Sequence, residues 1–382
     1  MKEHSTIAIR KWDWLLILGT TFAPMTLLRI WKIGPGEVMC FLWSLKYLQT
    51  REIKLTFVLR FFLLFYSAML IGAFICQYVA PDELRSVDLY TWLYLAVIAS
   101  VAYRYFSDAS FEYCAKILFL LSITATLWFF GLYFYSIYRS KIIYNIPLWY
   151  HNYRYTGGAN NPHQLAALNC ALIFSFAYFL IRREKMIISI AGIIANGIML
   201  IATKSSTGYL SVFIGTMVIA VCLISSFTSD KRQRYASLVG LFGLVVILCI
   251  FFSRQIYMVA YEWIQSDDNG VGRLELFSNI GVTFSQSPIF GLGPGTHSIY
   301  NQEYHNSYLE ILAAGGIIGI SALIWSSIVL FRKILKARFL IPIVVALYAY
   351  GLAGFVMRRI IFWVLIAIVC GMAEKYVAIS EL

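Results

Sequence analysis

Long apolar runs separated by short polar turns dominate the pattern of hydrophobic and polar positions along this chain. The stretches Ile117 to Tyr138 and Ile311 to Phe331 contain no charged residue. Runs of this length suit the hydrocarbon layer of a bilayer, roughly 30 Å thick, better than the core of a soluble domain. The pattern therefore predicts an all-α, polytopic membrane protein in which residues 1–382 form a single integral membrane domain.

The apolar runs divide into about twelve expected transmembrane helices, each bounded by charged or turn-forming residues. The expected spans are Trp14 to Leu28, Gly36 to Leu48, Phe57 to Val79, Tyr90 to Tyr105, Ala115 to Tyr138, Gln164 to Ile181, Ile187 to Ala202, Tyr209 to Phe227, Leu238 to Phe252, Ser307 to Phe331, Leu340 to Met357 and Ile360 to Val377.

Composition excludes a soluble fold, because 60% of the residues are hydrophobic and only 13% are charged. The net charge of +12 does not indicate nucleic-acid binding, since the basic residues sit mainly in short turns between apolar runs. The seven cysteines include no CxxC pair and no metal-ligand spacing, so we expect them to pack in the membrane domain.

Lysine and arginine should collect on the cytoplasmic side of a membrane protein, which gives the chain an orientation. An even number of spans then places both termini in the cytoplasm, and the cations of the inner turns are Arg51, Lys54, Arg182, Arg183, Lys185, Lys231, Arg232, Arg234, Arg332, Lys333, Lys336 and Arg338. The cations left on the outer side, where orientation gives them no purpose, are Arg29, Lys32, Arg139, Lys141, Arg154, Lys204, Arg254, Arg273, Arg358 and Arg359.

Two segments leave the membrane on that outer face: a smaller loop over residues 139–161 and a large loop over residues 253–306. The large loop contains helix-compatible stretches, Ile256 to Ile264 and Arg273 to Phe284, between Gly, Pro and Asn signals. We expect it to fold over the membrane and to carry function. The absence of an internal repeat weakens a transporter interpretation, because many transporters are built from duplicated halves.

The smaller loop runs into the next span through a turn that contains Arg154, Asn161 and His163. Glycines and an Asn-Pro pair permit a tight turn that holds Arg154 at the membrane surface beside a helix N-terminus, and both features favour an anion. The alternative is an anchor to lipid headgroups.

In the large loop, Arg273 stands at the start of an expected helix, where its fork of donors suits a phosphate group. A salt bridge to Glu275 or Asp268 is the alternative.

A Gly-Pro run from Pro288 to His297 precedes His305 and Asn306 at the entry to a long span. His305 would lie at the water boundary, where a base can meet both a soluble hydroxyl and a lipid-borne substrate. An interfacial polar role is equally compatible with His305, and His297 competes for the role of base. No histidine pair and no acidic pair in the outer loops has metal-ligand spacing, so a metal site is not expected.

Two further outer turns carry cations: Thr203 to Gly208, with Lys204, and the short hairpin with Arg358 and Arg359. Snorkelling to the membrane surface explains either turn. Lys204 nevertheless joins Arg154 and Arg273 on one face, where three converging cations would suit a diphosphate.

At these residues the sequence resembles the O-antigen ligase and polymerase superfamily of bacterial surface-polysaccharide assembly. The resemblance covers residues 149–325 and is carried by Arg154-x-x-Gly157-x-x-x-Asn161-Pro162-x-x-x-Ala166, Arg273-Leu274, Pro288-Ile289-Phe290-Gly291-x-Gly293 and His305-Asn306-Ser307-x-Leu309-x-x-x-x-x-x-Gly316-Ile317-x-Gly319. The chain departs from the family where Asn161-Pro162-His163 replaces Asn-Pro-Asn and where Ser206-Thr207-Gly208 replaces a Ser-Arg-Gly turn.

The resemblance implies a helical membrane glycosyltransferase, similar to the GT-C type, that needs neither a metal nor a nucleotide sugar. Its active site would face the periplasm from the bacterial inner membrane. Carried over to matching positions, His305 is the catalytic base, Arg154 and Arg273 bind the diphosphate, and Lys204 replaces the missing arginine. Asn161, His163, His297 and Asn306 are expected to bind substrate. The expected partners are an undecaprenyl-diphosphate-linked oligosaccharide donor and acceptor, membrane lipids and a chain-length regulator protein.

The acceptor separates the candidate activities. A polymerase extends a lipid-linked repeat unit, whereas a ligase moves the finished polymer onto lipid A-core. The sequence Asn-Pro-His-Gln-Leu-Ala resembles the polymerase branch, so we favour a polymerase. A lipid-linked oligosaccharide flippase, which is also basic and helical, is the alternative from another class.

Overall fold

The computed structural model of the protein describes residues 8–30, 33–49, 54–228, 230–251, 253–254, 257–258, 261, 273–295 and 303–380. These residues are overwhelmingly helical, which confirms the predicted all-α class. Seven helical segments among them are long and apolar enough to cross a membrane, and the protein is accordingly a multi-pass membrane protein.

The long helices follow the expected spans closely. They are α3 (Phe57–Val79), α4 (Ser86–Asp108), α5 (Phe111–Tyr138), α6 (Pro162–Ile181), α7 (Met186–Thr203), α8 (Ser206–Phe227), α9 (Lys231–Phe251), α13 (Ser307–Ile334) and α15 (Ile360–Ser380). The shorter helices are α1 (Asp13–Phe22), α2 (Pro35–Leu48), α11 (Arg273–Ser278), α12 (Ile280–Gln286) and α14 (Ile341–Gly351). Single 3-10 turns are η1 (Thr26–Leu28), η2 (Pro81–Glu83), η3 (Leu335–Leu340) and η4 (Val356–Arg358).

The count of spans by length and composition in the described residues is lower than the twelve expected, and α9 and α15 are not among the seven. Two further reasons are visible in the described helices. The helix α1 has 10 residues and α2 has 14, which is too short to cross a bilayer as a straight helix. The segment Ser307–Gly351, which joins α13 to α14, counts once where two spans were expected.

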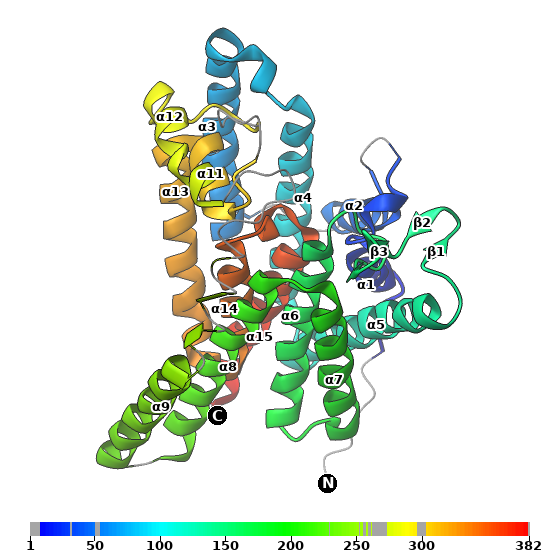
Figure 1. Ribbon diagram of the computed structural model, residues 1–382, viewed down its shortest axis with the longest axis vertical. Helices are drawn as coiled ribbons and strands as arrows, with labels where there is room; N and C mark the ends of the chain where they lie inside the picture. Colours follow the sequence, from blue (N-terminus) through cyan, green and yellow to red (C-terminus); the bar gives the residue numbers. More distant parts are fainter. Residues whose placement is uncertain are drawn as a thin grey trace.

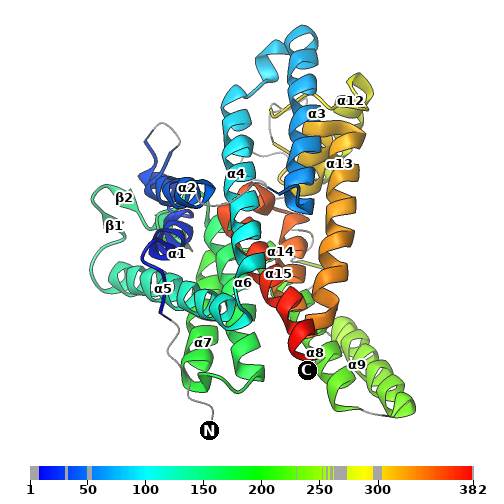
Figure 2. The ribbon, with the colours of Figure 1, turned by 180° about the vertical axis from the view of Figure 1, so that it is seen from behind.

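Most of the long helices run along the long axis of the molecule, whereas α5 lies across it (Figures 1 and 2). The turns α6–α7 and α8–α9 and the end of α15 lie at the lower end of Figure 1. The α3–α4 connection, α11 and α12 lie at the upper end. Two of the cation-rich turns expected in the cytoplasm, α6–α7 and α8–α9, therefore share one end, whereas α11 and α12 of the large loop lie at the other.

Several helices begin at a polar residue whose side chain accepts a hydrogen bond from the first turn. Such caps satisfy backbone N–H groups that have no partner within the helix. The capping residues are Thr56 before α3, Ser110 before α5, Asn161 before α6, Ser205 before α8 and Asn306 before α13.

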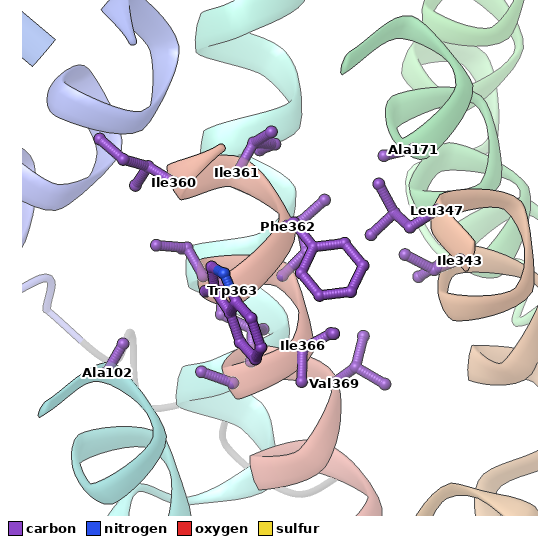
Figure 3. Packing of buried hydrophobic residues seen from close by; sticks show 14 of the residues in the cluster. Ala102, Ala171, Ile343, Leu347, Ile360, Ile361, Phe362, Trp363, Ile366 and Val369 are labelled. Carbon is purple, nitrogen blue, oxygen red and sulfur yellow. The ribbon is translucent and has the colours of Figure 1, made fainter. Parts of the chain in front are cut away.

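The centre of the bundle is α15, which is buried from Ile360 to Ala373. Phe362 of α15 faces Ile343 and Leu347 of α14, whereas Trp363 points away from them (Figure 3) and packs against Phe61 of α3. In a membrane protein such close packing, rather than the hydrophobic effect alone, holds helices together. The turn that precedes α15 is therefore fixed to the middle of the bundle.

The Gly-Pro run of the large loop enters the bundle between α3 and α13. We call residues 287–295 the inserted segment. Its Leu292 N–H donates to the carbonyl of Ala313 at 2.8 Å, and its Pro288 carbonyl accepts from the Ile317 N–H at 2.9 Å. These bonds fill the gap in the α13 ladder that opens at Gly316, where φ is 60° and ψ is −154°. A broken helix at membrane depth needs such partners for its freed backbone groups.

The smaller loop forms two short antiparallel ladders. β1 (Ile142–Ile143) pairs with β2 (Ile146–Pro147), and β3 (Trp149–Tyr150) pairs with β4 (Arg154–Tyr155). The second ladder places Arg154 at the start of α6. The next residue, Tyr155, fixes this strand, because its ring is buried and its hydroxyl donates to the Phe129 carbonyl at 2.6 Å.

Candidate active site

Arg154 is held at the turn between α7 and α8. Its Nε donates to the carbonyl of Thr203 at 3.1 Å, and its Nη2 lies 3.3 Å from Nε2 of His163. A guanidinium carries five N–H groups and only donates. Within the described residues these two contacts use two of the five, so the remaining donors can bind an anion.

His163 orients this guanidinium. Because Arg154 can only donate, His163 Nε2 must accept, which places the ring proton on Nδ1. Nδ1 then donates to Oγ of Ser205 at 2.9 Å. The neutral imidazole is thus a link between Arg154 and the start of α8.

Lys204 occupies the same turn. It has a left-handed backbone conformation with φ of 51°, and its Nζ lies 5.1 Å from the centre of the Tyr153 ring. A left-handed conformation costs a non-glycine residue about 1–2 kcal/mol, so it persists only where the surroundings impose it. Arg154 binds the carbonyl directly before Lys204, and the structure therefore brings these two predicted cations together.

We call Arg154, His163, Lys204 and Ser205 the Arg154 cluster. Tyr350, at the end of α14, joins this cluster to the C-terminal helices. Its hydroxyl donates to the His163 carbonyl at 2.7 Å and lies 3.4 Å from Ser205 Oγ. The turn that follows α14 therefore starts beside Arg154.

His305 lies against the middle of the same turn. Its ring centroid is 5.0 Å from that of Phe355, and its backbone is left-handed with φ of 48°. Tyr350 and Phe355 are five residues apart, so their Cα atoms are separated by at most about 18 Å at ~3.6 Å per residue. The short turn over residues 350–359 thus contacts both the Arg154 cluster and His305.

Asn306 and Asn161 both serve as helix caps. The Asn306 side-chain oxygen accepts from the N–H groups of Tyr308 and Leu309, and its Nδ2 donates to the Leu352 carbonyl at 2.8 Å. The Asn161 oxygen accepts from the His163 N–H at 2.9 Å. Their binding to substrate stays a prediction, and the structure gives each a capping role.

Arg358 is the centre of a buried ionic cluster. Its guanidinium lies 2.8 Å from Asp88, 3.2 Å from Glu303 and 2.9 Å from Glu310. Arg85 completes the cluster through Glu303 at 2.7 Å. The Arg358 side chain is only 15% exposed, so the snorkelling expected for it is wrong, because three carboxylates hold it inside the protein.

The charges in this cluster shift one another. Burial raises the pKa of Glu303, but the positive charges of Arg358 and Arg85 outweigh it and hold that pKa below its usual range. Burial by itself lowers the pKa of Arg358, but the surrounding carboxylates of Glu310, Glu303 and Asp88 outweigh burial and raise that pKa above its usual range. Since Glu303 lies two residues before His305, the cluster ties the end of the large loop to α4, α13 and η4.

Two predicted site residues cannot be placed. His297 and the side chain of Arg273 lie outside the described residues, as do Asp267 and Asp268. Glu275 itself is exposed on α11. The proposed contact of Arg273 with a diphosphate therefore stays a prediction.

Sequence reasoning missed the Arg358 cluster and the link through Tyr350 and Ser205. The signal for Arg358 was present, since an arginine on the outer side had no orienting purpose. Its three acidic partners, however, come from three separate segments. Among the described residues, no group of three or more His, Cys, Asp or Glu side chains could hold a metal ion.

Comparison with known proteins gives one family. Residues 191–324 match the O-antigen ligase family, whose members are glycosyl-transferring enzymes, and this supports an enzyme of that general kind. The match begins within α7, ends within α13, and includes Lys204, the inserted segment and His305. It bears out the resemblance to the O-antigen ligase and polymerase superfamily and does not separate the two activities. The comparison with curated proteins found no match.

Proposed function

Because the O-antigen ligase domain at residues 191–324 supports a place for this chain in the O-antigen ligase and polymerase superfamily, we propose that the protein is an O-antigen polymerase. It transfers a glycan from an undecaprenyl-diphosphate donor to a lipid-linked repeat-unit acceptor. The observation that carries the proposal is the turn over residues 350–359, which contacts the Arg154 cluster through Tyr350 and His305 through Phe355.

In the proposed reaction, His305 takes the proton from an acceptor hydroxyl while that oxygen attacks the anomeric carbon of the donor. The new C–O bond forms as the bond to the diphosphate breaks, and its electron pair leaves on the diphosphate oxygen. Arg154 and Lys204, with Arg273, bind the developing negative charge. Fixed donors of this kind stabilise the transition state without a general acid, because a diphosphate is already a good leaving group.

Arg154 is well suited to this role. Its orientation is fixed by Thr203 and His163, so little reorganisation is needed when an anion arrives. An aligned guanidinium also offers two parallel donors to a phosphate, which an ammonium cannot do.

The proposal also includes the side of the membrane from which the substrates arrive. The site faces the periplasm of the bacterial inner membrane, with both termini in the cytoplasm, and both lipid-linked substrates reach it from the outer leaflet. Membrane lipids surround the bundle, and a chain-length regulator protein is a further proposed partner.

The second candidate is an O-antigen ligase, which the description of the matching family favours. Deletion of the gene separates the two. Lipopolysaccharide capped with a single repeat unit indicates loss of a polymerase, whereas rough lipopolysaccharide with stranded lipid-linked polymer indicates loss of a ligase and would overturn the polymerase proposal.

A further inference from the structure

Arg359 differs sharply from its neighbour Arg358. Arg358 contacts three carboxylates, whereas no carboxylate in the described part of the chain lies within ion-pair distance of Arg359. The Arg359 side chain is only partly exposed. With the Gln164 amide oriented so that its nitrogen donates to the Pro24 carbonyl and to Thr26, the Gln164 oxygen accepts from Arg359 Nη2 at 3.2 Å. A neutral amide is thus its contact.

A second guanidinium lies close to it. Arg29 follows η1, and the η1 segment is fixed to the start of α6 because Thr26 Oγ1 accepts from the Asn160 N–H at 2.8 Å. Arg29 forms an ion pair with Glu37, and its Nε is buried without a hydrogen-bond partner among the described residues. Two arginines some 330 positions apart in the chain, from 29 to 359, are thus brought to one end of α6.

The charges around Arg359 leave its guanidinium without a carboxylate at ion-pair distance among the described residues. Burial, and after it the positive charges of Arg29 and Arg358, together lower the pKa of Arg359 to about 10, against smaller opposing effects from Glu303 and Glu310. A buried cation without a counter-charge is unfavourable, and an anion beside it offsets that cost.

The location is distinct from the Arg154 cluster. His163 contacts Arg154, and the next residue, Gln164, contacts Arg359. Successive residues on an α-helix point roughly 100° apart, so the two guanidinium groups flank the start of α6 from different sides.

We propose that Arg359, with Arg29 beside it, forms a second phosphate-binding site that holds the diphosphate of the acceptor lipid while the Arg154 cluster holds that of the donor. This inference rests on the proposed polymerase function, because the acceptor of a polymerase keeps its own diphosphate through the reaction. Each transfer then needs two phosphate-bearing lipids bound at once, one on either side of α6.

The test is the number of lipids bound per chain. The full-length protein is placed in nanodiscs and titrated with undecaprenyl diphosphate, and bound lipid is counted by native mass spectrometry. The variants are Arg359→Gln, Arg359→Lys and Arg154→Gln. Arg232→Gln, an exposed position on α9 at the other end of the molecule, is the control that removes the same charge.

The wild-type protein and the Arg232→Gln control should bind two lipids. Arg359→Gln and Arg154→Gln should each weaken one binding event at least about tenfold, as expected for loss of a charged hydrogen-bond donor. Arg359→Lys should retain part of the affinity, because it keeps the charge but lacks the planar fork. If Arg359→Gln cannot be purified, an Arg359→Lys protein with unchanged affinity at both sites overturns the proposal.

Competition identifies the ligand. Inorganic pyrophosphate should displace one lipid from Arg154→Gln, whereas phosphatidylglycerol at equal concentration should not. Displacement by phosphatidylglycerol alone would reduce the site to a general headgroup contact and overturn the acceptor assignment. Two bound lipids in Arg359→Gln would also overturn it while leaving the polymerase proposal intact. Two sites in a protein that transfers no glycan would instead count against the polymerase proposal.

Discussion

Replacement of Arg358 by glutamine should be the most destabilising single change in the buried ionic cluster that surrounds it. The variant leaves Asp88, Glu303 and Glu310 close together, with side-chain exposures of 11%, 22% and 15%. Removal of one partner from a buried ion pair typically costs about 3–5 kcal/mol, since the remaining charge is left uncompensated. Arg85 cannot take over, because it contacts Glu303 from a side chain that is 47% exposed.

The matched control is Arg85→Gln, which removes the same charge from the same cluster. A pair as exposed as this one contributes at most about 1 kcal/mol because solvent screens it. The free energy of unfolding of the purified protein, measured in detergent by denaturant titration, should therefore fall several times more for Arg358→Gln than for Arg85→Gln.

Glycan transfer should fall as well in Arg358→Gln, because Glu303 no longer fixes the backbone that leads to His305. Adding Glu310→Gln to Arg358→Gln should recover part of the lost stability by removing one of the uncompensated charges. Equal losses of stability in the two single variants, or a loss below about 1 kcal/mol for Arg358→Gln, would refute the reasoning.

Three further predictions concern the backbone, pH and the Arg154 cluster. Gly316→Ala should destabilise the protein by about 1–3 kcal/mol or more, because the backbone at Gly316 has a conformation that only glycine adopts readily. The control Gly197→Ala should be tolerated, because a Cβ there meets nothing within 4 Å. Thermal unfolding in detergent compares the two variants. The pKa of Glu303 is held below its usual range, so its contribution to stability is present above pH ~4.3 and is lost as pH falls through the lowered pKa. The difference in stability between wild type and Glu303→Gln, measured from pH 7 to pH 3, should therefore shrink with acid. A constant difference would contradict this. His163→Ala should slow glycan transfer by loosening Arg154 while leaving the unfolding midpoint nearly unchanged. A clear fall in the unfolding midpoint together with the transfer rate would indicate a purely structural histidine.

The helices were predictable from the sequence because hydrophobic length alone identifies segments that can cross a bilayer. The expected span Leu340 to Met357 shows where that signal stops being sufficient. The observed helix α14 ends at Gly351, since Asn306 and Ser307 bind the carbonyls of Leu352 and Gly354 and so fix a turn there. Those partners come from another helix, and no local pattern reveals them.

The Gly-Pro run of the large loop was recognised as unlike a helix or a strand, but its insertion between α3 and α13 was not predictable. The insertion depends on matched features in distant segments. Gly291 has φ of 69°, and a Cβ there would meet the Ala313 carbonyl oxygen at 2.4 Å. Only the fold shows that Gly291 packs against the backbone of α13.

The candidate site was predicted in part. The sequence identified Arg154 and Lys204 as cations without an orienting purpose, and the structure places both at one turn. The sequence did not identify the acids around Arg358, because an ion pair between α4, the large loop and η4 is set by tertiary packing rather than by spacing along the chain. The capping roles of Asn161 and Asn306 were available from the rule that Asn favours helix starts, but the family resemblance directed attention to substrate instead.

The most direct test of the proposed function is glycan transfer by the purified full-length protein supplied with a defined undecaprenyl-diphosphate-linked repeat unit and no added metal or nucleotide sugar. The wild-type protein should form longer lipid-linked oligosaccharides. His305→Ala should fold and bind lipid normally but transfer glycan about 10²–10⁴-fold more slowly, as expected for loss of a general base. Polymer formation by His305→Ala at the wild-type rate would contradict the account.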